Sequence, residues 1–247
     1  MRIPHRHASQ GPRTDARRAV TAAVTAVCAL GIVGCATDVG GAAHPDAAAT
    51  TAEVAGAALE TLLLDDPDIA RIVDAAMLHT VDTYTGMPEP AGRTYSDSFC
   101  GGAISAASTT TYTASSITDV RGRRLDDGDS DTAGTVLTRS VDQAVIAFPG
   151  AHAAREFVAA ARTGWAACAG TSVETRDAAG RALWRVEQPR FGEGVLSLTG
   201  THRSGWVTEH AISAQGAIVI DVAVSSAGAV ADRASTIVRN IADRIAQ

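Results

Sequence analysis

Hydrophobic and polar positions divide the chain into an N-terminal part without a folded core and a longer part with regular apolar spacing. An uncharged run covers residues 19–34, and the stretch that follows, to about residue 52, is small and polar without apolar periodicity. From residue 53 to the end, apolar residues recur at the spacings typical of amphipathic helices and of strands. The pattern therefore predicts a single folded domain over residues 53–247.

Four helices are predicted where apolar residues share one face. The first is short and includes Leu59 and Leu63. Asp66 and Pro67 mark the start of the second, because Asp caps free amides and Pro has no amide to leave unpaired. The third begins after Pro149, and the fourth closes the chain. One face of the third helix carries Phe157, Ala161, Trp165 and Cys168.

Short runs rich in Val, Ile, Thr and aromatic residues predict the strands. Turn signals at residues 178–180 and 214–216 separate neighbouring runs, so most strand pairs are expected to be antiparallel. The predicted strands cover residues 105–116, 135–148, 172–176, 182–187, 194–201, 205–213 and 217–224. Together with the helices they predict an α+β fold, a twisted, mostly antiparallel β-sheet flanked by helices.

A group of arginines precedes the uncharged run at the N-terminus. A basic segment followed by a short apolar run is the pattern of a signal peptide. The 16 residues of the run are fewer than the ~20 that a permanent membrane helix needs. We therefore predict an export signal over residues 1–34. Its arginines are Arg2, Arg6, Arg13, Arg17 and Arg18.

The uncharged run ends in Ile32-Val33-Gly34-Cys35, which resembles a bacterial lipobox. In such a signal the thiol receives a lipid, and the cysteine becomes the first residue after cleavage. We therefore expect lipidation of Cys35, a flexible tether over residues 35–52, and a domain anchored on the outer face of the cell membrane. The alternative is a buried core helix containing Cys35. The arginines before the run and the polar stretch after it argue against that alternative.

The charge balance excludes one class of partner. The whole chain has a net charge of −6, and all its basic side chains are arginines. Loss of the signal, which holds five Arg and one Asp, would leave 16 Arg and 26 acidic residues, a net charge of −10. An acidic chain lacks the basic face of a nucleic-acid binder, so we expect no nucleic-acid partner.

Two of the four cysteines remain once the signal and the lipid are taken into account. Cys28 lies within the signal, and Cys35 would carry the lipid, which leaves Cys100 and Cys168. Exported proteins fold in an oxidising compartment, where two remaining cysteines are expected to form a disulfide. A pair of separate, buried thiols is the alternative.

The sequence carries no catalytic signature. It contains no Gly-x-Ser-x-Gly nucleophile motif, no His-Glu-x-x-His zinc motif and no phosphate-binding glycine loop. His202 and His210 are close enough to share a face of the sheet, but Glu209 would point away from His210 in an extended segment. We therefore expect no enzymatic activity, no cofactor and no metal site.

The tryptophans are the candidates for ligand contact. Core packing is expected for Trp165 on its helix face. Trp206 follows Gly205 in a predicted strand, where an indole could line a cleft or fill a core. Trp206 and His210 are the residues predicted to line a ligand cleft.

Several segments, in their order and spacing, resemble the PknH-like extracellular domain. This domain is the sensor of a mycobacterial receptor serine/threonine kinase and also occurs in stand-alone lipoproteins. The resemblance covers nearly all of residues 59–245. Its segments are Leu62–Leu64 leading into Asp68-Ile69, Phe99-Cys100-Gly101, Val141–Val145 leading into Phe148-Pro149, Phe157, Trp165–Gly170, Gly205-Trp206 and Val219–Val222.

The resemblance has four implications. It implies a disulfide between Cys100 and Cys168. It also implies a second disulfide later in the chain, but Thr208 and Ser225 stand at those positions, so this chain has lost it. It implies a helix-flanked, twisted sheet with a cleft for an unidentified ligand. It implies no catalysis, and the chain has no kinase part, since no Gly-rich loop or His-Arg-Asp segment is present.

These observations support two hypotheses of function. The first is a membrane-anchored, extracytoplasmic lipoprotein whose sensor domain binds a small or envelope-derived ligand. The second is a structural or adaptor lipoprotein that presents a protein-interaction surface at the cell envelope. In both, the lipid anchor makes the membrane a partner.

Overall fold

A computed structural model of the chain describes residues 56–88, 92–128, 137–177, 180–229 and 231–247. The predicted signal peptide, the predicted tether and Cys35 lie outside the described residues. Within these ranges, no helix combines the length and the apolar character needed to cross a membrane.

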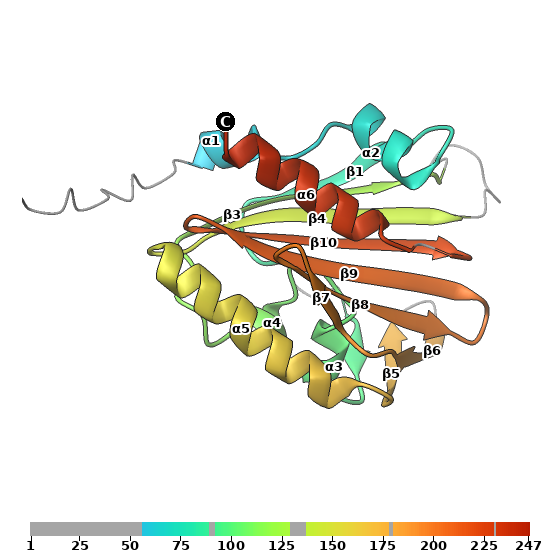
Figure 1. Cartoon of the computed structure of the whole chain (residues 1–247). Helices are drawn as coiled ribbons and strands as arrows, with labels where there is room; N and C mark the ends of the chain where they lie inside the picture. The colour runs from blue at the N-terminus through green and yellow to red at the C-terminus, as the bar shows by residue number, and fades with distance from the viewer. Residues whose placement is uncertain (1–55, 89–91, 129–136, 178–179, 230) are drawn as a thin grey trace, which may run out of the picture. The chain divides into compact units, whose positions relative to one another are not determined.

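The ten strands of the described ranges form one antiparallel sheet. Their order is β1-β3-β4-β10-β9-β8-β6-β5-β2, and β7 pairs with β8 off this path. Figure 1 shows the long strands β4, β10 and β9 side by side. The predicted antiparallel sheet is confirmed. The strands are β1 (His79–Tyr84), β2 (Thr94–Tyr95), β3 (Asp119–Asp126), β4 (Arg139–Ala147), β5 (Ser172–Asp177), β6 (Gly180–Val186), β7 (Arg190–Gly192), β8 (Val195–His202), β9 (Trp206–Gln215) and β10 (Ile218–Ala227).

Helices cover both faces of the sheet. Residues of α1, α2 and α6 pack into a core on one face, and residues of α3, α4 and α5 pack into a second core on the other (Figure 1). The flanking arrangement expected for an α+β fold is therefore present. The helices are α1 (Gly56–Glu60), α2 (Asp66–Val73), α3 (Ser98–Gly102), α4 (Thr109–Tyr112), α5 (Ala151–Cys168) and α6 (Arg233–Ile245).

Strand β10 shows how the two cores are divided. Ile218, Ile220 and Val222 belong to the core on the α6 side, whereas Val219 belongs to the core on the α5 side. Successive side chains of a strand point to opposite faces, so an apolar run of this kind is buried on both sides. Asp221 interrupts the run on the α5 side, where it is only 1% exposed.

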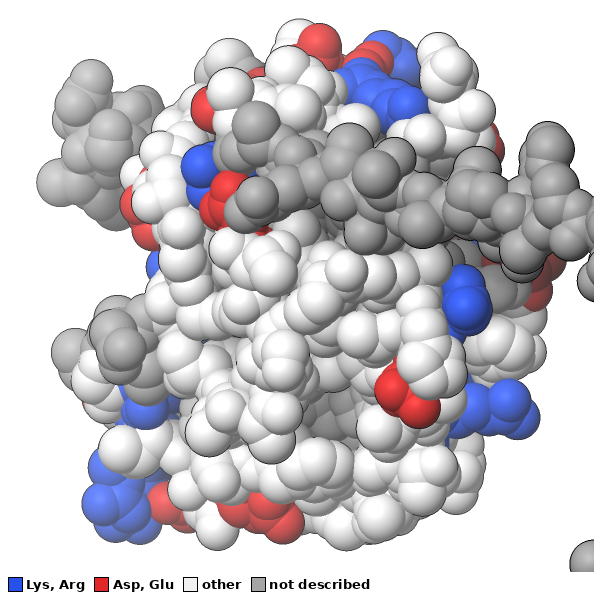
Figure 2. Space-filling view, turned by 90° about the vertical axis from the view of Figure 1, so that its left-hand side faces the viewer, with Lys and Arg blue, Asp and Glu red and all other residues white. Residues whose placement is uncertain are grey.

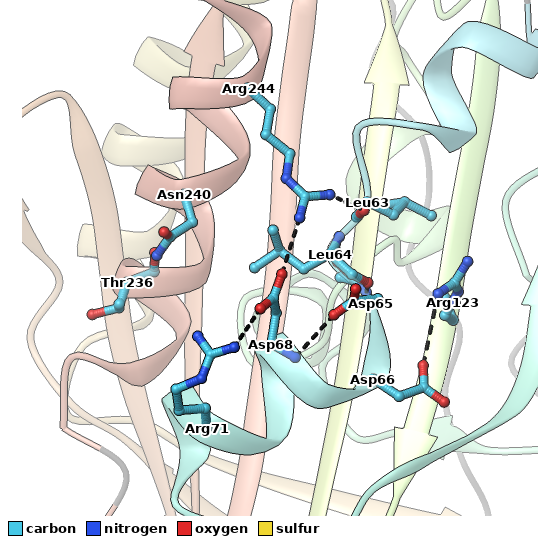
Figure 3. A network of polar contacts seen from close by, with 11 residues as sticks. Leu63, Leu64, Asp65, Asp66, Asp68, Arg71, Arg123, Thr236, Asn240 and Arg244 are labelled. Atoms are coloured by element: carbon cyan, nitrogen blue, oxygen red, sulfur yellow. Dashed lines mark hydrogen bonds and ion pairs between the residues drawn. The ribbon is translucent and has the colours of Figure 1, made fainter.

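Polar side chains fasten α2 to α6, as Figure 3 shows. Arg244 Nη1 donates to the carbonyl oxygen of Leu63 at 2.6 Å, and its Nη2 donates to Asp68 Oδ2 at 3.1 Å. Arg71 Nη2 donates to the other carboxylate oxygen of Asp68 at 2.6 Å. The hydrogen bond from Arg71 holds the pKa of Asp68 below its usual value.

The start of α2 differs by one residue from the prediction. Asp65, not Asp66, is the cap, since its side chain accepts a hydrogen bond from the amide of Asp68 at 2.9 Å. Asp66 is the first helical residue, and its carboxylate accepts hydrogen bonds from the amide and the hydroxyl of Thr80. The aspartate pair therefore caps the helix and ties its first turn to strand β1.

The strand predicted for residues 105–116 is wrong. The structure has turns and the short helix α4 there. Ala103 and Ala107 are fully buried, and Ala107 adopts a left-handed conformation with φ of 47°. Small side chains let this segment pass close to the sheet, so packing overrides the strand propensity of its Thr and Ser residues.

Strands β1 and β3, and the short strands β2 and β7, are absent from the prediction. Strand β3 is rich in charged residues, and its only apolar or small residues are Val120, Gly122 and Leu125. Its Arg124 pairs with Asp82 of β1 and with Asp142 of β4. Charge pairing with neighbours, which no local pattern reveals, replaces apolar alternation at this edge of the sheet.

A disulfide joins Cys100 of α3 to Cys168 at the end of α5. Both residues are buried in the core on the α5 side. The sequence separation is 68 residues, for which the chain-entropy model gives a stabilisation of roughly 4 kcal/mol. The bridge fixes α3, and the segment that follows it, to the helix that covers this face.

We predict that reduction lowers the thermal midpoint of the oxidised domain by many degrees. The reason is the chain entropy regained by the unfolded state. Thermal unfolding followed by circular dichroism, with and without reductant, measures the change. The Cys100→Ser/Cys168→Ser double variant is the control and should not respond to reductant. A wild-type midpoint unaffected by complete reduction would contradict the prediction.

Candidate ligand-binding cleft

A cleft opens on the α5 side of the sheet, beyond the area that the helices cover. Its volume is about 920 Å³, within the range of small-molecule sites. The segment Ile104–Thr109 forms one wall, and strands β3 to β6 and β8 to β10 supply the floor and the other walls. The strand side chains reach the same cleft because alternate residues of a strand share a face.

Aromatic rings form one side of the cleft. Trp184 of β6 and His202 of β8 are cross-strand partners, and their ring centroids lie 5.2 Å apart. Trp206 of β9 also lines the cleft and is half-buried. A Cβ atom at Gly200 would lie 2.9 Å from Cγ2 of Ile104, so only glycine lets the cleft wall approach the sheet this closely. Trp206, which the sequence suggests as a ligand-cleft residue, is thus among the residues that line this cleft, and its contact with a ligand stays a prediction.

A carboxylate with two donors lies at the other side of the cleft. Asp142 Oδ1 accepts a hydrogen bond from the Tyr84 hydroxyl at 2.6 Å, and its Oδ2 accepts one from Arg124 Nε at 3.1 Å. The Arg124 guanidinium also lies 5.4 Å from the centroid of the Tyr84 ring. Burial outweighs both donors and raises the pKa of Asp142 to about 6. The cleft thus contains a carboxyl group that titrates near neutral pH.

Sequence reasoning missed the Tyr84–Asp142–Arg124 cluster. Its members come from three strands and are far apart in the chain. The sequence does contain one signal for this site. Asp142 is a charged residue that directly follows the buried Val141 in the mostly apolar strand β4. The partners that make it part of a site depend on the register of β1, β3 and β4.

The structure does not place His210 in the cleft, which corrects its predicted role. The side chain is fully buried, and its ring centroid lies 4.5 Å from that of Trp165. Nδ1 lies 2.9 Å from the carbonyl oxygen of Ala103, and Nε2 lies 2.6 Å from Asp221 Oδ1. A carbonyl oxygen only accepts, so Nδ1 donates the hydrogen bond to Ala103. His210 is therefore a core residue beneath the cleft.

Asp221 connects His210 to the wall of the cleft. Its second oxygen accepts hydrogen bonds from the Tyr112 hydroxyl at 2.8 Å and from the amide of Ala107 at 3.0 Å. Ala107 belongs to the Ile104–Thr109 wall. The buried pair therefore holds the left-handed residue of that wall in place. Glu209 points to the other face, as predicted, and accepts hydrogen bonds from the start of α6.

Thr208 and Ser225 lie on the floor of the cleft. They are direct partners across β9 and β10, and their hydroxyl oxygens lie 2.7 Å apart. A cross-strand hydrogen bond thus occupies the place where the resemblance implies a second disulfide.

Titratable residues do not form a metal centre here. Across the part of the chain that the structure describes, no three His, Cys, Asp or Glu side chains lie close enough together to hold a metal ion.

A comparison with protein-family models matches residues 54–244 to the PknH-like extracellular domain. This chain belongs to that family. Two curated relatives are the serine/threonine-protein kinases PknH of Mycobacterium tuberculosis and Mycobacterium bovis, each 27% identical to this chain over 203 residues. The match covers 81% of this chain but only 31% and 32% of the two kinases. The chain therefore matches about a third of the length of each relative.

The crystal structure of the extracellular domain of PknH from Mycobacterium tuberculosis matches with a TM-score of 0.71 and 25% sequence identity. The match covers 78% of this chain and 97% of that domain. The family model describes an extracellular domain, and the matched crystal structure is the extracellular domain of the kinase PknH. PknH-like extracellular domains lie outside the cytoplasm, and the same location follows for this one.

We predict that Asp142 makes the domain less stable as the pH rises from 4 to 6. The unfolded carboxyl group loses its proton near pH 3.9 and the folded one near pH 6, so the folded state binds more protons in this range. Urea unfolding at each pH should show wild type losing roughly 2 kcal/mol relative to Asp142→Asn. Asp82→Asn removes the exposed partner of the same arginine and is the control. Parallel profiles for wild type and Asp142→Asn would contradict the prediction.

We also predict that His210→Ala costs about 3–5 kcal/mol of unfolding free energy, because it leaves the buried Asp221 without its main partner. Tyr112→Phe should cost about 1–3 kcal/mol, since one donor is lost while the ring remains. Urea unfolding at pH 7 measures both changes. His202→Ala, on the cleft rim, is the matched control and should cost less than about 1 kcal/mol. Equal costs for the two histidine variants would show that the buried pair has no special role.

Proposed function

We propose that this chain is a membrane-anchored, extracytoplasmic lipoprotein whose PknH-like domain binds a small or envelope-derived ligand in the cleft. The observation that carries the proposal is the cleft itself, about 920 Å³ in a domain of a sensor family. A domain without a ligand has no evident use for an open cavity of this size lined by aromatic and charged side chains.

The lining of the cleft supports a ligand with both apolar surface and hydrogen-bonding groups. Trp184 and Trp206 offer flat apolar rings, on which a sugar or another ring can stack. Arg93 and Arg181 also line the cleft, and their guanidinium groups suit anionic or hydroxyl-bearing ligands. Asp142 adds a carboxyl group whose charge changes near neutral pH.

The proposed anchor rests on the N-terminal sequence. Residues 1–34 have the basic segment and the apolar run of an export signal, and Cys35 stands at its end. One acyl chain binds a membrane only marginally, whereas the two or three chains of a processed lipoprotein hold it firmly. An anchor of this kind would keep the domain at the cell envelope, near an envelope-derived ligand.

The alternative is an adaptor lipoprotein that presents a protein-interaction surface. A broad area of surface without charged side chains supports this alternative. Arginines and carboxylates lie mainly at the margins of that area (Figure 2). Uncharged surfaces are common at the centres of protein interfaces. An adaptor would use this surface and would not need the cleft. A variant that alters only the cleft therefore distinguishes the two proposals.

Native mass spectrometry of the protein extracted from its own membrane tests the proposal. We expect a mass increase from lipid on Cys35 and a co-purified small molecule that is lost in the Trp206→Ala variant. Met77→Ala, which removes an exposed apolar side chain away from the cleft, is the control. An unmodified Cys35 would contradict the anchor. Unchanged ligand in Trp206→Ala, or no ligand in wild type, would contradict the cleft and favour the adaptor.

A further inference from the structure

A second cavity lies along α5 and shares no lining residue with the cleft. It has a volume of about 860 Å³ and runs between one side of the helix and the segment that includes strand β7. Strands β8 and β9 contribute one floor residue each, Leu196 and Ala214. We call this cavity the α5 groove. Its helix residues are Arg155, Val158, Ala159, Arg162, Thr163 and Ala166.

The floor and one wall of the α5 groove are apolar. Val158 and Leu196 are buried beneath it, and Phe191 of β7 stands at its side with 50% of its surface exposed. Pro189 adds a further apolar group next to Phe191. The helix residues from Arg155 to Ala166 extend over about 16 Å of helix length, so the groove is long and suits an extended apolar molecule.

The charged groups of the groove are all positive. Arg155 and Arg162 stand on the same side of α5, two helical turns apart. Arg162 lies 4.8 Å above the Phe191 ring, and Arg190 forms an ion pair with Asp232. No Asp or Glu is among the described lining residues, although the chain as a whole is acidic. The α5 groove therefore combines apolar surface with two arginines that no carboxylate neutralises in the described contacts.

We propose that the α5 groove binds a fatty acid, an anionic amphiphile with one carboxylate and a linear apolar chain. The carboxylate pairs with Arg155 or Arg162, because a guanidinium group matches a carboxylate with two parallel hydrogen bonds. The chain lies over Val158 and Leu196, where burial of apolar surface supplies the remaining affinity. This proposal concerns a site other than the cleft and does not depend on the ligand proposed there.

Binding of dodecanoate, measured by isothermal titration calorimetry below its critical micelle concentration, tests this proposal. The domain should bind dodecanoate and should bind dodecanol, which has the same chain without the charge, at least tenfold more weakly. The Arg155→Gln and Arg162→Gln variants identify the arginine that pairs with the carboxylate, and the double variant should weaken binding at least tenfold. Arg185→Gln removes an exposed arginine of β6 outside the groove and is the matched control.

A steric variant separates the groove from other surfaces. Ala159→Trp places a large ring in the groove from an exposed helix position, so it should abolish dodecanoate binding without unfolding the domain. Trp206→Ala in the cleft should leave dodecanoate binding unchanged, which keeps this test independent of the cleft ligand. Equal binding of dodecanol, full binding by Ala159→Trp, or binding only to vesicles of anionic phospholipid would overturn the proposal.

Discussion

The carboxyl group of Asp221 lies in the middle of β10, at a point where both faces of the sheet are covered. Its oxygens contact donors from three separate parts of the chain, His210 on β9, Tyr112 on α4 and the backbone of Ala107. A buried carboxylate is unfavourable unless such partners are present. The cleft wall has no strand or long helix of its own, so Asp221 fixes its position together with the disulfide that holds the preceding helix α3.

The sequence alone predicts the parts of the fold in which local pattern and packing agree. The strands from residue 172 onward other than the exposed β7, and the helix that carries Trp165, follow from apolar spacing, because their side chains face a core. The segment of residues 105–116 and strand β3 do not follow from it. The first is shaped by contacts with the distant Asp221, and the second by charge pairs with neighbouring strands.

The candidate site was predictable to a smaller extent. Trp206 could be proposed as a cleft residue because it follows Gly205 at the start of a predicted strand, although the same position also suits a core residue. Nothing in the sequence was a reason to treat His210 differently from Trp206. In the structure, however, His210 is buried below the cleft, where it contacts Trp165 and Asp221. Depth below a surface depends on which elements cover a strand, and a single sequence does not contain that information. The Asp142 cluster was missed because its members come together only through the register of β1, β3 and β4.

The hydroxyl pair of Thr208 and Ser225 gives the cleft floor a chemical property that a disulfide would not have. One hydroxyl donates to the other, so the accepting oxygen keeps its own hydrogen free to donate outward, and lone pairs remain on both. A cystine at this place would offer only weakly polar sulfur. The hydroxyl pair between the two central strands can therefore exchange hydrogen bonds with water or with an oxygen-rich ligand. Unlike a disulfide, this link between the strands is not broken by a reductant.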